Sequence, residues 1–408
     1  MLKKVFITSI LFFIIALGFA GYIVFFKNDT APTPSAEEEN SNEEFTPFGP
    51  DSENRPIEIG TSTKPTDNNE TVSIPVATVT QLSADPSAST FAYTSGPTTF
   101  VRFAERAQGH IFEVNMSTGE QTRISNTTLP KIQETLWLNG GNTVIYRYLS
   151  ETDSIRTYNA ALVKSKAVDT TLREVKGTFL SEGIEAVVAS PDLKKIFFLE
   201  RISGGIQGIV AASDGSNRRT IFNSALTEWN ISWPETNTIT LTTKPSSGIS
   251  GYAYFLNPTS GSLKKVLGPV NALATLTNPS ATFVAFTDAS TLLQLYNVKT
   301  GAITQAKVGT IVDKCVWSKK QSSTLYCAVP KIIGTGKFPD LWYQGQVSFT
   351  DKLYTIRIDT GVNEPLTDEK NITTKNLDIS HITLSPTEEY LFVTNKKDST
   401  PWSIRLTP

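Results

Sequence analysis

Two cysteines, Cys315 and Cys327, are the residues whose type and spacing most directly suggest chemistry. They lie on either side of a turn-like segment, residues 319–323. If a hairpin is centred on Gln321, Cys315 lies directly opposite Cys327, within reach of a disulfide. The alternative is that both are small buried apolar side chains. The pair is not Cys-x-x-Cys, so a redox role is not indicated.

The other reactive side chains form no recognisable catalytic motif. The chain has two histidines, His110 and His381, which we interpret as structural or surface residues, and too few Cys and His residues for a zinc site of the usual spacing. It has no Gly-x-Ser-x-Gly elbow and no phosphate-binding glycine loop. We therefore expect no enzyme activity and no cofactor or metal, although paired carboxylates for glycoside chemistry stay open because their separation is spatial.

A long segment, residues 329–345, carries a dense aromatic cluster beside prolines and glycines. Long loops often carry recognition, and exposed Trp and Tyr are typical interface anchors. The alternative is that these aromatic side chains fold back and plug the top of the domain. The candidate partner-binding residues of this loop are Phe338, Pro339, Asp340, Trp342, Tyr343 and Gln344.

The elements that must position these residues are short alternating strands, the pattern of an all-β domain. One proline turn recurs, because proline favours a type I turn and a preceding Asp, Asn or Ser accepts backbone hydrogen bonds. Its copies are Asp85-Pro86-Ser87, Ser190-Pro191-Asp192, Trp233-Pro234-Glu235, Asn278-Pro279-Ser280 and Ser385-Pro386-Thr387, with degenerate copies at 139–142 and 318–320. Seven turns at a period of roughly 40–50 residues predict a seven-bladed β-propeller.

A second turn recurs about two strands after the first. Glycine at its end supplies a positive φ at a hairpin tip. The copies are 115–119, 214–215, 257–261, 297–301 and 359–361, and the stretch 163–166 takes this place in the second repeat.

The two ends of the repeat region complement each other. After Pro386 only the strands 390–395 and 402–406 remain, so the last blade lacks a fourth strand. Residues 76–83 form an extra alternating strand before the first turn. We expect this strand to be the outer strand of the last blade and to close the ring, which protects an edge that invites aggregation.

The Ser-Pro-Asp turn followed by an aromatic-aliphatic strand resembles the TolB-type, WD-repeat-like β-propellers of bacteria. The resemblance covers residues 76–408 and is clearest at Ser190-Pro191-Asp192 and Ser385-Pro386. It implies the fold and does not decide the function, because propellers include both binding modules and enzymes.

The N-terminus reads as a membrane anchor. Lys3 and Lys4 precede an apolar run, residues 5–26, long enough to span a bilayer core. By the positive-inside rule, residues 1–4 stay in the cytoplasm and the rest of the chain lies outside. The alternative is a signal peptide cleaved after Ala20, which exports the domain equally.

Residues 27–75 are expected to be a disordered acidic linker. Eleven acids and two bases lie between Asn28 and Thr71, with few apolar residues to stabilise a fold. No dense basic stripe occurs in the chain, so nucleic acid is not an expected partner. The layout of anchor, stalk and propeller also looks like that of membrane-anchored bacterial surface proteins.

These features together predict a membrane-anchored, extracytoplasmic propeller that acts as a binding or scaffold module for an envelope protein or glycan. Two alternatives remain: an extracytoplasmic enzyme that acts on glycans, and a structural assembly factor for an envelope complex.

Overall fold

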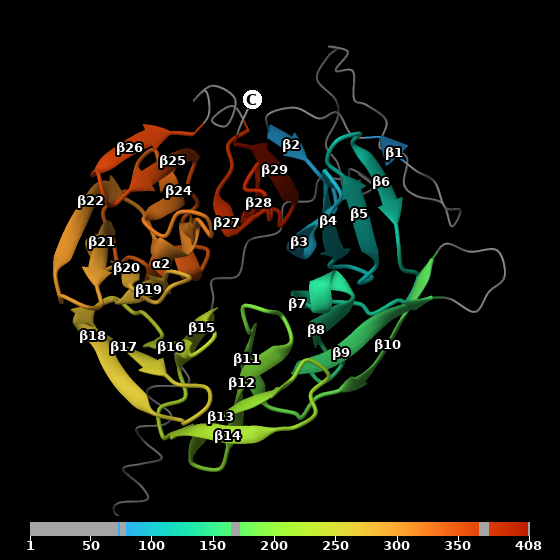
Figure 1. Ribbon diagram of the computed structural model, residues 1–408, viewed down its shortest axis with the longest axis horizontal. Coiled ribbons are helices and arrows are strands. Elements are labelled where there is room, and N and C mark those ends of the chain that lie inside the picture. Colours follow the sequence, from blue (N-terminus) through green and yellow to red (C-terminus); the bar gives the residue numbers. More distant parts are fainter. Residues whose placement is uncertain (1–71, 74–78, 165–171, 367–374, 407–408) are drawn as a thin grey trace, which may run out of the picture. The chain divides into compact units, whose positions relative to one another are not determined.

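Seven antiparallel sheets arranged in a ring form the part of the chain that the computed structural model describes, residues 72–73, 79–164, 172–366 and 375–406 (Figure 1). The chain divides into two units at Lys64 and Pro65, and all described residues belong to the second. The all-β, seven-bladed propeller predicted from the turn spacing is therefore confirmed.

The first three sheets, here called blades, follow the chain in order. The first contains β3 (Ser87–Ser95), β4 (Thr98–Glu105), β5 (Ile111–Asn115), β6 (Glu120–Arg123) and β1 (Val72–Ser73). The second contains β7 (Ile132–Leu138), β8 (Thr143–Leu149), β9 (Ile155–Lys164) and β10 (Arg173–Phe179). The third contains β11 (Ile184–Ala189), β12 (Lys195–Ile202), β13 (Gly205–Ala212) and β14 (Arg219–Ser224).

The next three blades repeat this order. The fourth contains β15 (Trp229–Glu235), β16 (Thr238–Thr243), β17 (Ser250–Leu256) and β18 (Leu263–Asn271). The fifth contains β19 (Ala274–Thr277), β20 (Phe283–Thr287), β21 (Leu292–Asn297) and β22 (Ile303–Gly309). The sixth contains β23 (Cys315–Trp317), β24 (Thr324–Pro330), β25 (Asp351–Arg357) and β26 (Val362–Pro365).

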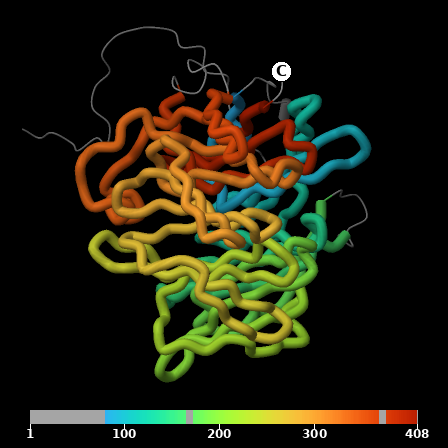
Figure 2. Tube along the Cα trace, turned by 60° about the vertical axis from the view of Figure 1, so that its left-hand side comes forward, coloured from blue at the N-terminus to red at the C-terminus, as the bar shows by residue number. Residues whose placement is uncertain are grey.

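The seventh blade closes the ring with a strand from the other end of the repeat region. It contains β27 (Ile379–Leu384), β28 (Tyr390–Asn395), β29 (Pro401–Arg405) and β2 (Val79–Gln81). Val79 pairs with Ile404 and Gln81 with Trp402, so β2 is the outer strand of this blade. The blue and red segments therefore lie side by side in Figure 2.

The hydrophobic core lies between neighbouring blades. One cluster joins Phe197 and Leu199 of β12 to Trp229 and Trp233 of β15, all of them buried. Alternating strands supply such side chains on both faces of each sheet, which is why a propeller needs no covering helices.

The proline turn has the geometry expected from its sequence. The Leu193 amide donates to the Ser190 carbonyl at 2.8 Å, which defines the turn between β11 and β12. The Ser190 hydroxyl accepts a hydrogen bond from the Lys195 amide at 2.9 Å. Turns beginning at Asn278 and Ser385 carry the same backbone bond, so this turn is the repeated connection between the first and second strands of a blade.

The first blade departs from the predicted spacing. Asp85-Pro86 lies between β2 and β3, where the chain enters the blade, whereas the β3–β4 hairpin turns at Gly96 and Pro97. The Asp85-Pro86 turn therefore follows the strand that closes the last blade, as predicted, but it is not equivalent to the hairpin turns with which it was grouped.

The second turn joins the third and fourth strands of a blade, as expected. Gly119, Gly215, Gly261, Gly301 and Gly361 all have positive φ, between 70° and 82°. The predicted stretch 163–166 of the second blade includes the end of β9, and its residues 165–166 lie outside the described residues.

The predicted anchor at 5–26 and the predicted cytoplasmic residues 1–4 lie outside the described residues. Within the described ranges, no helix is both long enough and apolar enough to cross a bilayer. Of the predicted linker, 27–75, only residues 72–73 are described, and they form β1, paired with Gln121 and Glu120 of β6.

Candidate binding cavity

The aromatic segment between β24 and β25 packs back onto the ring and contains the short helix α2 (Asp340–Tyr343). Phe338 and Trp342 are 5% and 3% exposed and pack with Ile311 and Phe349. Pro339 is also buried. These residues are therefore not exposed interface anchors, since they bury more apolar area by plugging the ring than by facing water.

The other three candidate residues of the segment have different environments. The half-buried Asp340 carboxylate accepts hydrogen bonds from the Ser247 amide at 2.9 Å and from the Ser246 hydroxyl at 3.1 Å, which ties α2 to the fourth blade. Tyr343 and Gln344 are exposed. A partner-binding role for this segment stays a prediction, with Tyr343 and Gln344 as its accessible side chains.

A buried charge cluster beneath Trp342 holds the aromatic segment in place. This segment, residues 329–345, is called the plug from here on. The Lys314 ammonium is fully buried and lies 2.7 Å from an Asp351 oxygen and 2.5 Å from an Asp378 oxygen. The Trp342 indole donates to Asp378 at 3.1 Å. A buried cation is tolerable only when paired in this way, and the cluster connects the sixth blade, the seventh blade and the plug.

Next to this plug lies a cavity of about 470 Å³. Its wall is formed by the segments with which three successive blades begin, together with α2. These segments are β19 of the fifth blade, the short helix η2 (Val312–Lys314) before the sixth blade and β27 of the seventh blade. The polar lining residues are Thr275, Asp313, Tyr343, Ser380, His381 and Lys396.

Asp313 and Tyr343 hydrogen-bond to each other in the cavity wall. The Tyr343 hydroxyl donates to an Asp313 carboxylate oxygen at 2.6 Å. Both residues are reached by water, yet the wall surrounds them on the other sides, and this burial raises the pKa of Asp313 while the bond from Tyr343 opposes the rise. Burial, followed by the Asp313 charge, raises the pKa of Tyr343.

His381 also lines the cavity and is exposed there, in agreement with our interpretation of it as a structural or surface residue. It has φ 48° and lies where the pairing register of β27 with β28 shifts. Burial lowers its pKa, while the charges of Glu134 and Asp313 act in the opposite direction. Positive φ in a non-glycine residue is a strained conformation that often marks functional positions. His110, in contrast, is buried in the first blade.

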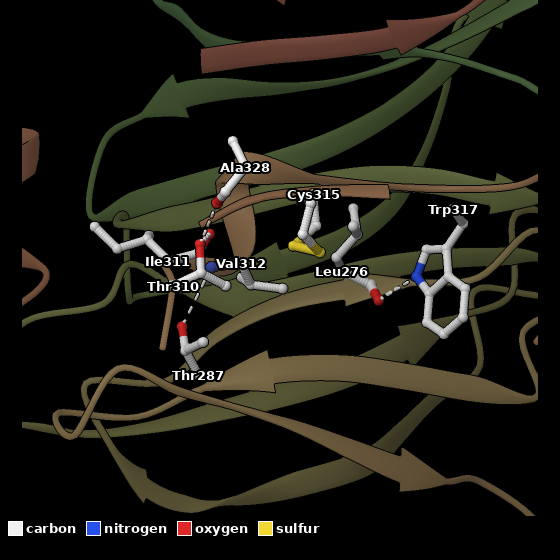
Figure 3. The surroundings of a disulfide bond; sticks show 9 residues. Leu276, Thr287, Thr310, Ile311, Val312, Cys315, Trp317 and Ala328 are labelled. Atoms are coloured by element: carbon white, nitrogen blue, oxygen red, sulfur yellow. Dashed lines mark hydrogen bonds between the residues drawn. A yellow bond between two sulfur atoms is a disulfide. The ribbon is translucent and has the colours of Figure 1, made fainter. Parts of the chain in front are cut away.

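The cysteine pair lies beside this wall. Cys315 and Cys327 are opposite each other in the β23–β24 register, their Cα atoms are 4.1 Å apart, and a disulfide joins them. Figure 3 shows Cys315 next to η2, where the Thr310 hydroxyl donates to the Ala328 carbonyl and the Val312 amide to Thr287. These contacts hold the turn that carries Asp313.

The cavity lining combines charged, hydrogen-bonding and apolar side chains. Nowhere in the described ranges do three His, Cys, Asp or Glu side chains come together as metal ligands. The lining offers one carboxylate, one imidazole, one ammonium and several hydroxyls. Sequence reasoning found Tyr343 and missed Asp313, His381 and Lys396, because only the fold brings these three distant positions together.

Comparisons with known proteins give the fold and no family. No protein-family model matches the chain, and no curated protein matches it either. An oligogalacturonate lyase solved in complex with manganese is similar at TM-score 0.56 with 10% identity, over 84% of this chain and 99% of that one.

Two further solved structures are similar. The oligogalacturonate lyase of Vibrio parahaemolyticus aligns at TM-score 0.56 with 9% identity, over 83% of this chain and 98% of that one. TolB from Acinetobacter baumannii aligns at TM-score 0.43 with 14% identity, over 65% of this chain and 62% of that one. At such identities the lyases support the propeller fold alone.

Proposed function

We propose that this propeller is a binding module that holds a small saccharide-type ligand in the cavity between the fifth, sixth and seventh blades. One observation carries the proposal. The cavity gathers a carboxylate, a phenol, an imidazole and an ammonium from Asp313, Tyr343, His381 and Lys396, which lie in separate stretches of the chain. Such convergence of polar groups on one hollow is typical of a ligand site.

The size of the cavity favours a small ligand or the end of a chain over a folded protein surface. Small-molecule sites commonly enclose about 300–1,000 Å³, and this cavity has about 470 Å³. The Tyr343 ring and hydroxyl, together with the Asp313 acceptor, match the combination of apolar faces and hydroxyl groups on a sugar.

We further propose that the domain faces the cell envelope, held there by the anchor predicted at residues 5–26. The order of Lys3 and Lys4 before an apolar run supports this topology. The disulfide between Cys315 and Cys327 supports an oxidising compartment. An envelope glycan is then the ligand source that this location supplies.

The cavity gives less support to glycan hydrolysis. A glycosidase of the common type needs two carboxyl groups about 5–10 Å apart on one cavity. Asp313 is the single acid among the described residues that line this one. Binding therefore fits the lining better than cleavage by a carboxylate pair.

Calorimetric titration of the full-length protein with mono- and disaccharides tests the proposal. We expect Tyr343→Phe to weaken binding about tenfold. The variant loses the hydroxyl that donates to the Asp313 carboxylate at 2.6 Å and orients this acceptor for the ligand. One hydrogen bond to a charged group contributes about 1.5 kcal/mol. Tyr252→Phe is the matched control, since Tyr252 lies in β17 of the fourth blade and does not line the cavity. Absence of saccharide binding, or equal loss in both variants, would contradict the proposal.

A further inference from the structure

We infer that the ligand carries a carboxylate and that Lys396 binds it, so that the cavity selects an acidic sugar. The inference rests on the proposed saccharide-binding function and adds to it the charge of the ligand and the residue that binds the charged group.

Lys396 is held in place by the fold. It directly follows β28, and its backbone amide donates to the Asp378 carbonyl at 2.7 Å. Its side chain is half-buried, and Nζ lies 5.2 Å from the centre of the Trp342 ring. The ammonium is therefore placed at the cavity wall beside the rigid plug.

The charge of Lys396 has no partner of opposite sign in the described part of the chain, where no carboxylate lies within ion-pairing distance of Nζ. Lys314 provides the contrast, because its ammonium also faces Trp342, at 4.9 Å, but is neutralised by Asp351 and Asp378. Of these two ammonium groups beside the Trp342 ring, that of Lys314 is neutralised and that of Lys396 is available.

An available cation in a partly desolvated wall favours an anionic ligand. A half-buried ammonium has lost part of its hydration, and a carboxylate that binds it forms a charge-assisted hydrogen bond about twice as strong as a neutral one. The aromatic face of Trp342 compensates only a fraction of that loss. A neutral sugar hydroxyl supplies no opposite charge.

The rest of the lining sets the orientation of such a ligand. Asp313 repels a carboxylate and accepts from hydroxyl groups, while Tyr343 lies against it at 2.6 Å. The acidic group of the sugar is therefore directed to Lys396 and its hydroxyls to Asp313. Three further lining residues offer hydrogen-bonding groups to the hydroxyls of such a ligand, namely Thr275, Ser380 and His381. This division favours a sugar acid over a simple carboxylate without hydroxyls.

The test uses glucuronate and glucose as probes, because the two differ in charge at a single carbon. Full-length protein is titrated with each, and with a disaccharide that ends in glucuronate, to separate a free sugar acid from a glycan end. Lys396→Met removes the charge and keeps the apolar stem. Lys299→Met is the control, since Lys299 is an exposed lysine in the turn between β21 and β22.

We expect glucuronate to bind at least tenfold more tightly than glucose, and Lys396→Met to abolish this preference while Lys299→Met keeps it. Tight binding of the disaccharide alone would assign the site to glycan ends. Added salt should weaken glucuronate binding more than glucose binding.

Equal binding of glucose and glucuronate, or a preference that survives in Lys396→Met, would overturn the inference and leave saccharide binding intact. Failure of both sugars and the disaccharide to bind would overturn the inference together with the proposed function.

Discussion

At the scale of one residue, the Asp313 carboxyl is partly desolvated by the cavity wall, which disfavours its charged form. It lies in the cavity wall with a single strong donor, Tyr343, and burial raises its pKa. A folded protein keeps such a group at a cost in stability, and groups of this kind concentrate at functional sites.

The variant Asp313→Asn makes this cost measurable. The folded-state pKa of Asp313 is raised above 3.8, the ordinary value of an aspartate side chain, so on raising the pH the unfolded chain releases this proton first. Wild type should therefore lose stability, relative to the variant, as the pH rises from about 4 toward 8. The asparagine oxygen can still accept from Tyr343.

Thermal unfolding of both proteins across this pH range is the measurement. The difference in Tm should be smallest at the acidic end, where the unfolded chain is still partly protonated at Asp313, and should widen with pH in favour of the variant. A difference that narrows or reverses as the pH rises would show that Tyr343 and nearby positive charges outweigh desolvation.

The hairpin turns show how single positions control an element. Gly301 ends the turn between β21 and β22 with φ 76°, and a Cβ added there would meet no atom within 4 Å. Gly334, in the segment before α2, has equally open space and no positive φ. The pair therefore separates backbone strain from steric clash.

We expect Gly301→Ala to lower the free energy of unfolding by about 1–2 kcal/mol, the cost of a left-handed conformation with a Cβ. Gly334→Ala should be neutral or slightly stabilising, because it restricts the unfolded chain. Urea unfolding followed by circular dichroism gives both values, and equal effects at the two sites would refute the conformational explanation.

At this scale the sequence was most informative where the determinants are local. Ser190-Pro191 and Gly301 specify turns by their own side chains or backbone freedom, and the opposition of Cys315 and Cys327 follows from one short hairpin. The same local logic grouped Asp85-Pro86 with the hairpin turns, although the β3–β4 hairpin turns at Gly96-Pro97, because both are good turn sequences.

The candidate site was less predictable because its determinants are distant in the chain. Nothing near Lys314 indicates that Asp351 and Asp378 will neutralise it, or that Trp342 will bond to Asp378. His381 reaches the cavity through a register shift in β27 that no alternation pattern reveals. The plug itself was foreseen, as the alternative to an exposed loop, and the burial of Phe338 and Trp342 confirms it.

On the scale of the whole ring, closure depends on the three residues of β2. Their pairing gives β29 a hydrogen-bonded neighbour on each edge, β28 on one side and β2 on the other. Unpaired strand edges are templates for association with other chains.

Two truncated chains test this dependence. Residues 85–408 lack β1 and β2, whereas residues 76–408 lack β1 alone and retain β2. We expect the shorter chain to unfold at a lower temperature and to form soluble oligomers or aggregates in light scattering, while the longer one stays monomeric. Equal melting temperatures and monodispersity would show that the closing strand is dispensable.

The closing pair also has a consequence for the timing of assembly. The chain is made from its N-terminus, so β2 is among the first strands of the ring to emerge and its partner β29 is the last. Contacts between positions so far apart form late and slowly. During synthesis and any export, β2 therefore stays unpaired until the other strands of the ring have been made. The nascent chain thus exposes an unpaired strand edge, which is prone to association, until β29 has been made and pairs with β2.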